Sequence, residues 1–572
     1  MALTPSAAGT PRPDWRSGES ALLAILVAIT LLLAVAPVLR LLIESAFPTA
    51  GGGPAVAVLK QAATWNATRR TLEVTIGGTL LAAVVGTIMA LLAALTDIRA
   101  RPALVFGFVL PLMIPPQVTA IAWLQVFGPS SPLLKMLDMA PPIGSRNPLY
   151  SRDGIILLLG IHYAPLVFLT LRAGLRRLPR DFVEAALATG ASPLRVVATI
   201  VVPIMIPALI AGVMLTLVSC VGNFGIPALL GIPGGYTVLT TLIYQRLAGL
   251  GPRVLADVAT LSVLIGVVVF VGIWAQAWLL RRGDYRISGT SAEAPRFELG
   301  RWRLPAEILA WALVLFTFVL PMLALTLTSL VPAYGVKLTA ANATLENYRF
   351  VIFDHGPTRR AFVNSFLLSA GAALLLIALS LPLGHFIARR GGRLLGGLAF
   401  TAELPYALPG VVLAIACILL FLKPLPLLGF SLYNTVWIIL VAYLMRFLIL
   451  VLRPVVAAFQ QLDRSYEEAA QMAGARFAFR QRTVSLPMVA PAAAAGALIV
   501  FLTAFNELTV SALLWSSGAE TLGVAVFSLE QGGESTYAAA LSALSVVATI
   551  AIMALGAAIG RRMPQGVVPW RD

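Results

Sequence analysis

Long apolar runs separated by short polar intervals dominate this chain, and they predict membrane-spanning helices. A helix needs about 20 mostly apolar residues to cross the hydrocarbon core of a bilayer. Twelve segments reach this length, although proline and glycine interrupt many of them. The expected spans are 21–43, 72–96, 103–127, 154–173, 203–224, 255–280, 306–330, 361–388, 396–422, 432–452, 488–514 and 537–560. We therefore expect an all-α integral membrane protein.

The composition agrees with this interpretation. Of 572 residues, 59% are hydrophobic and only 12% are charged, which is too apolar for a soluble protein of several domains. Arg12 and Arg16 precede the first apolar run. That run is longer than the core of about 7–15 residues found in a cleaved signal peptide, so we expect it to be retained as a helix.

One polar interval between spans occurs twice, with every spacing kept. The first copy reads Glu184-Ala185-Ala186, then Gly190-Ala191, Pro203 and Pro207, and the second reads Glu468-Ala469-Ala470, then Gly474-Ala475, Pro487 and Pro491. Each pair of landmarks is separated by 284 residues. A repeat in one register predicts two equivalent halves.

Further landmarks extend the repeat toward the N-terminus of each half. The stretch from Leu110 to Pro115 resembles that from Leu404 to Pro409, and Thr71 likewise matches Ser365, all at a separation of 294 residues. The change from 294 to 284 places ten extra residues in the first half. The loop 128–153, rich in proline, serine and glycine, is the natural position for them.

Six spans in each half give the two halves the same orientation, with an axis along the membrane normal. The expected divisions are a first half at 1–283 with the repeated loop at 178–203, a charged linker at 284–303, and a second half at 304–572 with the repeated loop at 462–487.

The distribution of basic residues predicts the orientation in the membrane. The net charge is +16, and with both termini inside, the inner loops hold 26 of the 41 Lys and Arg residues while the outer loops hold 13. Positive residues favour the cytoplasmic side. We therefore expect both termini, the linker and both repeated loops in the cytoplasm. Because no basic domain stands apart from the spans, nucleic-acid binding is not expected.

The repeated loop reads locally as a helix, a turn and a second helix. Glu184 lies near the positive end of the first helix dipole, and the alanines that follow are strong helix formers with small side chains. Gly190 permits a sharp turn, after which Pro193 starts a second helix. A single copy would fit an amphipathic helix lying on the bilayer equally well. Two copies with identical spacing favour a docking surface.

The pattern Glu-Ala-Ala-x3-Gly-x12-Pro resembles the conserved cytoplasmic loop in membrane subunits of binding-protein-dependent ABC importers of the type I group. The resemblance implies two tandem six-helix halves of the type I importer permease fold in a bacterial inner membrane. In that family the loop is a coupling helix, which docks on a cytoplasmic ATPase. The coupling-loop residues would be Glu184, Ala185, Ala186, Gly190 and Pro203 for one ATPase copy, and Glu468, Ala469, Ala470, Gly474 and Pro487 for the other.

The chain carries no nucleotide-binding signature of its own. It contains no Gly-x4-Gly-Lys-Ser/Thr and no Gly-Lys pair at all, so a phosphate-binding P-loop is not expected. The chain would then be no enzyme and bind no cofactor, and ATP would be used by a separate subunit. The resemblance implies three partners: two copies of that ATPase, an extracytoplasmic substrate-binding protein, and the lipid bilayer.

The fused twelve-span layout also resembles permeases of ferric-iron importers and of their relatives for thiamine, polyamines and phosphonates. The stretches Asn223–Gly234 and Asn506–Ser511 are similar to members called iron(III) permeases. Ferric iron is thus the expected substrate, and an organic ligand of one of the other three classes is the alternative.

Polar residues within the spans are candidates for a translocation path, because such groups are costly in lipid and usually face a cavity or a partner. These are Asn223, Asn506 and Glu507, together with Arg446 and Glu403. Asn223 and Glu507 are equivalent in the 284-residue register, near the expected end of the fifth span of each half. The alternative role for them is hydrogen bonding between helices.

The remaining reactive side chains predict no metal centre. Cys220 and Cys417 fall within spans and are expected to be buried, and His162, His355 and His385 are scattered without ligand spacing. An ion-coupled secondary transporter shares the twelve-span layout but needs titratable groups deep in the bundle, which are few here. A membrane-embedded enzyme would need a catalytic constellation, and the sequence offers none.

Overall fold

The computed structural model describes residues 18–48, 55–142, 144–176, 178–249, 251, 253–280, 297–424 and 429–560. Within these residues the regular structure is helical, apart from one isolated bridge between Thr96 and Phe297. The expected all-α class is therefore confirmed.

The helices follow one another in the same order twice. The first series is α1 Gly18–Ala34, α2 Ala36–Ala46, η1 Ala55–Lys60, α3 Ala62–Leu95, α4 Arg101–Met113, α5 Pro116–Phe127, α6 Pro132–Met136, α7 Arg152–Leu175, α8 Arg180–Ala188, α9 Pro193–Val196, η2 Val197–Val201, α10 Val202–Gly222, η3 Pro227–Gly231, α11 Ile232–Gly234, α12 Leu239–Leu247 and α13 Val254–Leu280. The second series is η4 Gly300–Trp302, α14 Arg303–Val314, η5 Leu315–Val319, α15 Leu320–Ser329, α16 Glu346–Arg349, η6 Phe350–Asp354, α17 Gly356–Arg390, α18 Arg393–Thr401, α19 Leu404–Ala407, α20 Gly410–Phe421, α21 Val436–Gln461, α22 Ser465–Met472, α23 Phe477–Arg480, η7 Gln481–Ser485, α24 Leu486–Phe505, α25 Ser511–Leu514, α26 Leu522–Gln531 and α27 Ser535–Gly560.

The ten extra residues of the first half lie where the sequence placed them. The connection from α5 to α7 has 24 residues, whereas the equivalent connection from α20 to α21 has 14. The longer connection contains the short helix α6.

Nine helices in the described part of the chain are long and apolar enough to cross a membrane. Three pairs of consecutive helices also qualify when each pair is taken together, which gives up to twelve spans. The pairs are α1 with α2, bent by 40°, α4 with α5 and α6, bent by 104°, and α18 and α19 with α20, bent by 107°.

The apolar segments expected at 103–127 and 396–422 are therefore each a sharply bent pair and not one straight helix. Pro115 and Pro116 in one half, and Pro409 in the other, lie at the bends. Proline cannot donate a backbone hydrogen bond, and it forces the preceding residue into an extended conformation. Ile114 and Leu408 accordingly have ψ angles of 136° and 140°. The repeated Leu-Pro stretch marks a sharp bend in each half.

The second helix of each repeated loop runs directly into a span. Residues Pro193–Gly222 form one continuous 30-residue helix, and Phe477–Phe505 form one of 29 residues. Each contains a π-helical turn, η2 or η7, just before Pro203 or Pro487. The missing N–H of proline leaves a carbonyl of the preceding turn without its helical donor, which favours such a turn. The second helix of each loop is therefore joined to its span without a break in the helix.

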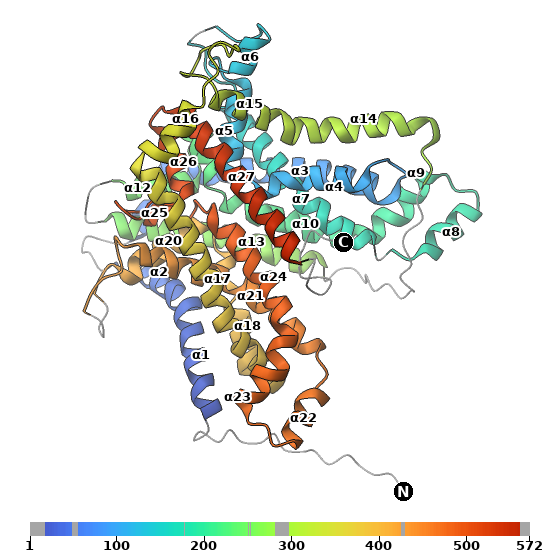
Figure 1. The fold of residues 1–572 in the computed structure, drawn as a ribbon, viewed down its shortest axis with the longest axis vertical. Coiled ribbons are helices and arrows are strands. Elements are labelled where there is room, and N and C mark those ends of the chain that lie inside the picture. The colour runs from blue at the N-terminus through green and yellow to red at the C-terminus, as the bar shows by residue number, and fades with distance from the viewer. Residues whose placement is uncertain are drawn as a thin grey trace.

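The molecule has two arms, and the two repeated loops lie at their tips (Figure 1). Helix α8 is at the end of one arm and α22 at the end of the other. The first helices are exchanged between the halves: α14 packs along α3 and α4, while α1 packs along α17, α18 and α21. Helix α2 likewise packs on α20, and α15 on α5. The first helix of each half therefore packs against the other half.

The end of the expected linker is attached to the first half. Residues 284–296 lie outside the described part of the chain, but Phe297 donates its amide to Leu95 O at 2.7 Å and is buried. Two residues later, the Leu299 amide donates to Asp97 Oδ1 at 3.1 Å. Arg303, the first residue of α14, forms an ion pair with the same Asp97 at 3.3 Å. The beginning of the second half is therefore fixed at the end of α3.

Candidate functional site

Both repeated loops adopt the expected helix-turn-helix form, and both end their first helix in the same way. Gly190 and Gly474 have φ angles of +83° and +80°, a left-handed conformation that glycine adopts without steric cost. The amide after each glycine reaches back across the turn, from Ala191 to Ala186 O at 3.2 Å and from Ala475 to Ala470 O at 3.0 Å. A left-handed glycine followed by this backbone bond is the Schellman motif, which ends many helices.

The surfaces of the two loops are exposed and partly apolar. Glu184, Ala185 and Gly190 are exposed in the first loop, as are Glu468, Ala469 and Gly474 in the second, while Ala186 and Ala470 are half-buried. Large apolar side chains lie next to them, with Leu194 83% exposed and Met472 89% exposed. Exposed apolar groups on a surface turned to water are typical of contact sites.

The second loop also contains a hollow of about 480 Å³ beside its glycine. It is lined by Ala470, Ala473, Gly474, Ala475, Arg476, Phe479, Thr483 and Val484. Small side chains form its floor, so another protein element can approach the backbone closely at this point.

Asn223 lies just beyond α10 and organises the turn that follows. The expected span 203–224 ends earlier, at Gly222, so Asn223 stands after the helix and not within it. Its Oδ1 accepts from the Ile226 amide at 3.0 Å, and its Nδ2 donates to the Tyr163 hydroxyl at 2.9 Å. Thr240 on α12 donates to its carbonyl at 3.2 Å.

Glu507 caps the equivalent turn in the second half. The expected span 488–514 is also too long, because α24 ends at Phe505. Glu507 Oε1 accepts from the Val510 amide at 2.8 Å, and Oε2 accepts from the Ser511 amide at 3.1 Å. The residue is 7% exposed. Asn223 and Glu507 thus cap equivalent turns from equivalent positions, each through the amide three residues ahead.

Asn506 connects the two halves. Its Nδ2 donates to Thr549 on α27 at 2.8 Å, and its carbonyl accepts from Gln117 Nε2 at 3.0 Å. Gln117 is at the start of α5, so this second bond joins the first half to the second. Asn223, Asn506 and Glu507 are all buried and hydrogen-bonded within the chain. Their polar groups are therefore used in capping turns and in joining neighbouring segments.

Three aromatic rings meet where the halves face each other. Tyr244 on α12 and Phe527 on α26 are each the sixth residue of their helices, and their ring centroids are 6.1 Å apart. Phe224 packs against both, at 5.1 Å and 5.7 Å. Residues related by a two-fold axis touch each other only beside that axis, so Tyr244 and Phe527 mark the pseudo-two-fold axis. Sequence reasoning missed this pair, although the two aromatic residues are 283 positions apart, close to the repeat.

The short helices that carry these rings are held in the same way in both halves. The hydroxyl of Thr71 on α3 accepts from the Leu239 amide at the start of α12, at 2.8 Å. The hydroxyl of Ser365 on α17 accepts from the Leu522 amide at the start of α26, also at 2.8 Å. The early match between Thr71 and Ser365 therefore identifies two equivalent helix caps supplied from a neighbouring helix.

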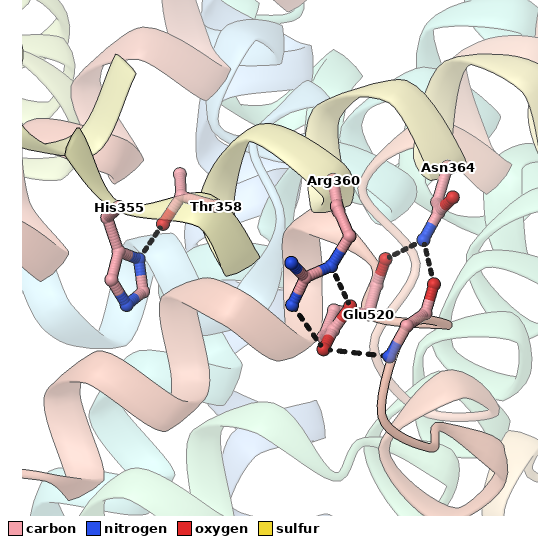
Figure 2. A network of polar contacts seen from close by, with 6 residues as sticks. His355, Thr358, Arg360, Asn364 and Glu520 are labelled. Atoms are coloured by element: carbon pink, nitrogen blue, oxygen red, sulfur yellow. Dashed lines mark hydrogen bonds and ion pairs between the residues drawn. The ribbon is translucent and has the colours of Figure 1, made fainter. Parts of the chain in front are cut away.

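A second contact lies beside each cap, and Figure 2 shows it in the second half. Asn364 donates to the carbonyls of Gly518 and Glu520 at 3.0 and 2.9 Å, and Arg360 forms a two-pronged contact with the Glu520 carboxylate at 3.2 and 3.3 Å. Burial raises the pKa of Glu520, but hydrogen bonds from Arg360 and from the Gly518 amide outweigh it, so the pKa lies below its usual range. In the first half, Arg70 donates to Gly235 O at 3.1 Å.

Replacing Ser365 with alanine is expected to loosen the start of α26. A buried backbone amide left without an acceptor costs about 1–3 kcal/mol, and 1.4 kcal/mol corresponds to about a tenfold change in an equilibrium. Hydrogen exchange of peptides covering 520–526 in detergent should therefore be about tenfold faster in Ser365→Ala. The control Ser365→Thr keeps the hydroxyl, as Thr71 does in the first half. Unchanged exchange in the alanine variant would refute the cap.

The two remaining candidate residues, Glu403 and Arg446, have different surroundings. Glu403 forms an ion pair with Arg453 at 2.8 Å on the surface. The guanidinium of Arg446 packs over Gly410, where it leaves no room for a Cβ atom. Cys220 and Cys417 are both buried, as expected. Among the described residues, no group of three or more His, Cys, Asp or Glu side chains is placed to hold a metal ion.

Comparison with known families finds one match in each half. The sequence model of the family described as "Binding-protein-dependent transport system inner membrane component" matches residues 82–284 and again 380–566. These two ranges contain both repeated loops and the residues at the pseudo-two-fold axis.

Individual relatives include permeases with and without a named substrate. A probable ABC transporter permease of Sinorhizobium fredii is 28% identical over 519 residues, covering 89% of both chains. A Fe(3+)-transport system permease of Haemophilus influenzae is 26% identical over 391 residues, covering 68% of this chain and 72% of the relative. A putative 2-aminoethylphosphonate transport system permease of Salmonella typhimurium is 35% identical over 130 residues, covering 22% of this chain and 43% of the relative.

Proposed function

Since the chain belongs to the family of binding-protein-dependent transport system inner membrane components, we propose that its repeated loops, at α8–α9 and α22–α23, are the two docking sites for a cytoplasmic ATPase. The chain is the permease component of an ABC importer, a multi-pass inner-membrane protein and not the catalytic part of the system. Membership in this family implies an ATPase and a substrate-binding protein as partners.

One observation carries the docking proposal. Two loops of the same conformation, each ended by a left-handed glycine, lie exposed at the tips of the two arms (Figure 1). Each then continues as an unbroken helix into a span. Two equivalent sites on one chain fit two copies of one ATPase subunit, one on each loop. ATP would be bound in those subunits, since this chain has no P-loop motif.

The same arrangement supports the orientation that we propose. Glu19, at the start of α1, pairs with Arg390 at the end of α17 at 3.0 Å, beside the second loop. Phe297, at the end of the expected linker, lies beside the first loop in the same apolar cluster as Val183. These contacts and the bias of basic residues support a cytoplasmic side that holds both termini, the linker at 284–303 and both loops. We propose the divisions 1–283 and 304–572 together with this orientation.

The translocation path would run along the pseudo-two-fold axis. In a permease of two equivalent halves, the axis is the line that both halves surround. Tyr244 and Phe527, which contact each other, would close it, and Asn223 and Glu507 cap the turns that follow the fifth spans. Asn506 belongs to the same region through its bond with Gln117.

We propose ferric iron as the substrate, on the extent of the alignments. Relatives named for ferric iron align with 68–78% of this chain, whereas those named for a phosphonate align with 22%. Thiamine, polyamine or phosphonate is the alternative. The family match weighs against an ion-coupled secondary transporter, whose uptake would collapse with an ionophore and need no ATPase.

The experiment is a gentle purification of the tagged protein from its own host after crosslinking. We expect an ATPase subunit and a substrate-binding protein to accompany it. The binding protein is then titrated with Fe(III), thiamine, polyamines and phosphonates. Tight and selective binding of Fe(III) supports iron import, and preference for an organic ligand replaces the substrate. Recovery of the permease without any ATPase, under conditions that retain the binding protein, would contradict the docking proposal.

A further inference from the structure

The second repeated loop rests on a polar cluster. Glu467, on the inner side of α22, accepts from Arg389 Nε at 3.3 Å and from the Ser485 hydroxyl at 2.8 Å. His385 Nδ1 lies 3.8 Å from the same carboxylate oxygen, and the Gln481 amide is 3.1 Å from that ring nitrogen. These contacts join α22 to α17 and to η7. The Glu467 and Arg389 side chains are only 15% and 11% exposed.

The equivalent positions in the first half are apolar without exception. In the repeat register, His385, Arg389, Glu467, Gln481 and Ser485 correspond to Leu91, Leu95, Val183, Val197 and Val201. All five of these apolar residues belong to one hydrophobic cluster beneath α8. At these five positions the two loops therefore differ: the side chains under α22 are polar, which we call the polar seat, and those under α8 are apolar, which we call the apolar seat.

The two kinds of seat differ in how they resist movement. Apolar contact is non-directional, so a helix can shift on an apolar surface while most of its contact area is kept. Hydrogen bonds to charged groups are directional, and leaving one partner of a buried pair alone is strongly unfavourable. We therefore expect α22, which is held by such a network, to move together with α17 and η7.

The aromatic surroundings of His385 strengthen this difference. Its ring packs edge-on against Phe459 on α21 and Phe477 on α23, each at 5.4 Å. Arg390, next to Arg389, stacks over Phe386 at 5.0 Å and pairs with Glu19 on α1. The network thus extends from the loop to three long helices, α17, α21 and α1.

We propose that Glu467 is a positioning residue that fixes the second ATPase-docking helix to α17 and η7, so that this loop transmits ATPase closure as a rigid lever while the first loop adjusts on its apolar seat. The proposal rests on the docking function assigned to the loops. It makes the two halves of one chain mechanically unequal, although they face identical ATPase copies.

The first test measures positions without any ATPase. Spin labels are placed in the second half at Met472→Cys and Leu394→Cys, and in the first half at their register equivalents, Ala188→Cys and Ala100→Cys. All four positions are exposed, while the native Cys220 and Cys417 are buried. In nanodiscs, we expect a narrower distance distribution for the second pair than for the first. Equal widths would overturn the proposed difference in stiffness.

The decisive variants change the polar seat. Glu467→Val introduces the residue found in the first half, and Glu467→Gln keeps the acceptor oxygen without its charge. A five-residue exchange, His385→Leu, Arg389→Leu, Glu467→Val, Gln481→Val and Ser485→Val, reproduces the complete apolar seat. Because that seat already supports α8, the exchanged protein is expected to fold even if Glu467→Val alone does not. The matched control is Val183→Ala, which trims the apolar seat.

The readout is transport per ATP hydrolysed in proteoliposomes containing the whole importer, measured beside ATPase retention on purification. In the five-residue exchange we expect normal ATPase retention, a broadened label distance at α22, and transport per ATP reduced about tenfold, within the usual range of coupling between sites. Glu467→Gln should fall between this variant and the parent, and Val183→Ala should resemble the parent.

The outcomes separate this proposal from the docking function. If the exchanged protein transports as efficiently per ATP as the parent, Glu467 is only a structural anchor and the proposal fails. If substitutions at the loop glycines leave ATPase retention intact, the docking function fails instead, whatever the label distances show.

Discussion

The paired substitution Gly190→Glu and Gly474→Glu is expected to leave a folded, inserted protein that no longer retains an ATPase. Both glycines have left-handed φ angles, and an added Cβ would meet no atom within 4 Å. The chain itself therefore has room for the new side chains. Each would instead project from the turn into the space where a partner approaches.

The expected size of the effect follows from the two costs involved. A non-glycine residue in the left-handed region costs about 1–2 kcal/mol, which is local to an exposed helix end. Dominant interface positions are worth about 2 kcal/mol or more, or about 30-fold in affinity at each loop. We expect ATPase retention on affinity purification, and with it transport, to fall to background in the double variant.

Asparagine provides the matched control, because it tolerates the left-handed conformation better than other residues. Gly190→Asn with Gly474→Asn should keep the Schellman turns, and it adds a small uncharged group. We expect partial retention of the ATPase in this control. Full retention in the double glutamate variant would show that the two loops are not the docking sites.

Truncating Tyr244 and Phe527 together to alanine is expected to make the membrane leaky. The two rings touch at the pseudo-two-fold axis, and apolar constrictions act as barriers by excluding water. An aromatic side chain buries about 150–250 Å², so losing both would open a gap wide enough for water. Efflux of a small cation from proteoliposomes, without ATP, should rise clearly above that of empty liposomes.

Two controls keep this measurement interpretable. Tyr244→Phe retains both rings and should remain tight. Phe366→Ala removes a ring of the same kind from an exposed position on α17, 53% accessible and away from the axis, and should also remain tight. Because an aromatic-to-alanine change in a packed core costs about 3–5 kcal/mol, the double variant must elute as a single species. A well-folded double variant without leak would place the barrier elsewhere.

Much of the candidate site could be predicted because its signals are local or repeated. The Schellman turns depend on a glycine and on bonds spanning five residues, so Gly190 and Gly474 could be identified from spacing alone. The match of Thr71 with Ser365 was also visible in the sequence. Its meaning was not, since the amides that these hydroxyls cap lie 168 and 157 residues away.

The ends of the fifth spans could not be predicted from hydropathy. Asn223 and Glu507 are followed by further apolar residues, so the apolar run continues where the helix stops. The helices end because these side chains accept hydrogen bonds from amides three residues ahead, and such caps compete with the helix itself. The bends at Pro115 and Pro409 were marked by proline, but their angles of 104° and 107° depend on packing.

By itself, the sequence determined that this chain is a helical membrane protein of two equivalent halves with a repeated polar loop. Those properties depend on the length of the apolar runs, on residue spacing and on a constant register, all of which can be read from the sequence alone. Only the tertiary structure decided which helices exchange between the halves, that Tyr244 meets Phe527, and that α22 rests on charged groups where α8 rests on leucine and valine. These features depend on contacts between residues far apart in sequence, whose positions are fixed by the packing of every helix between them.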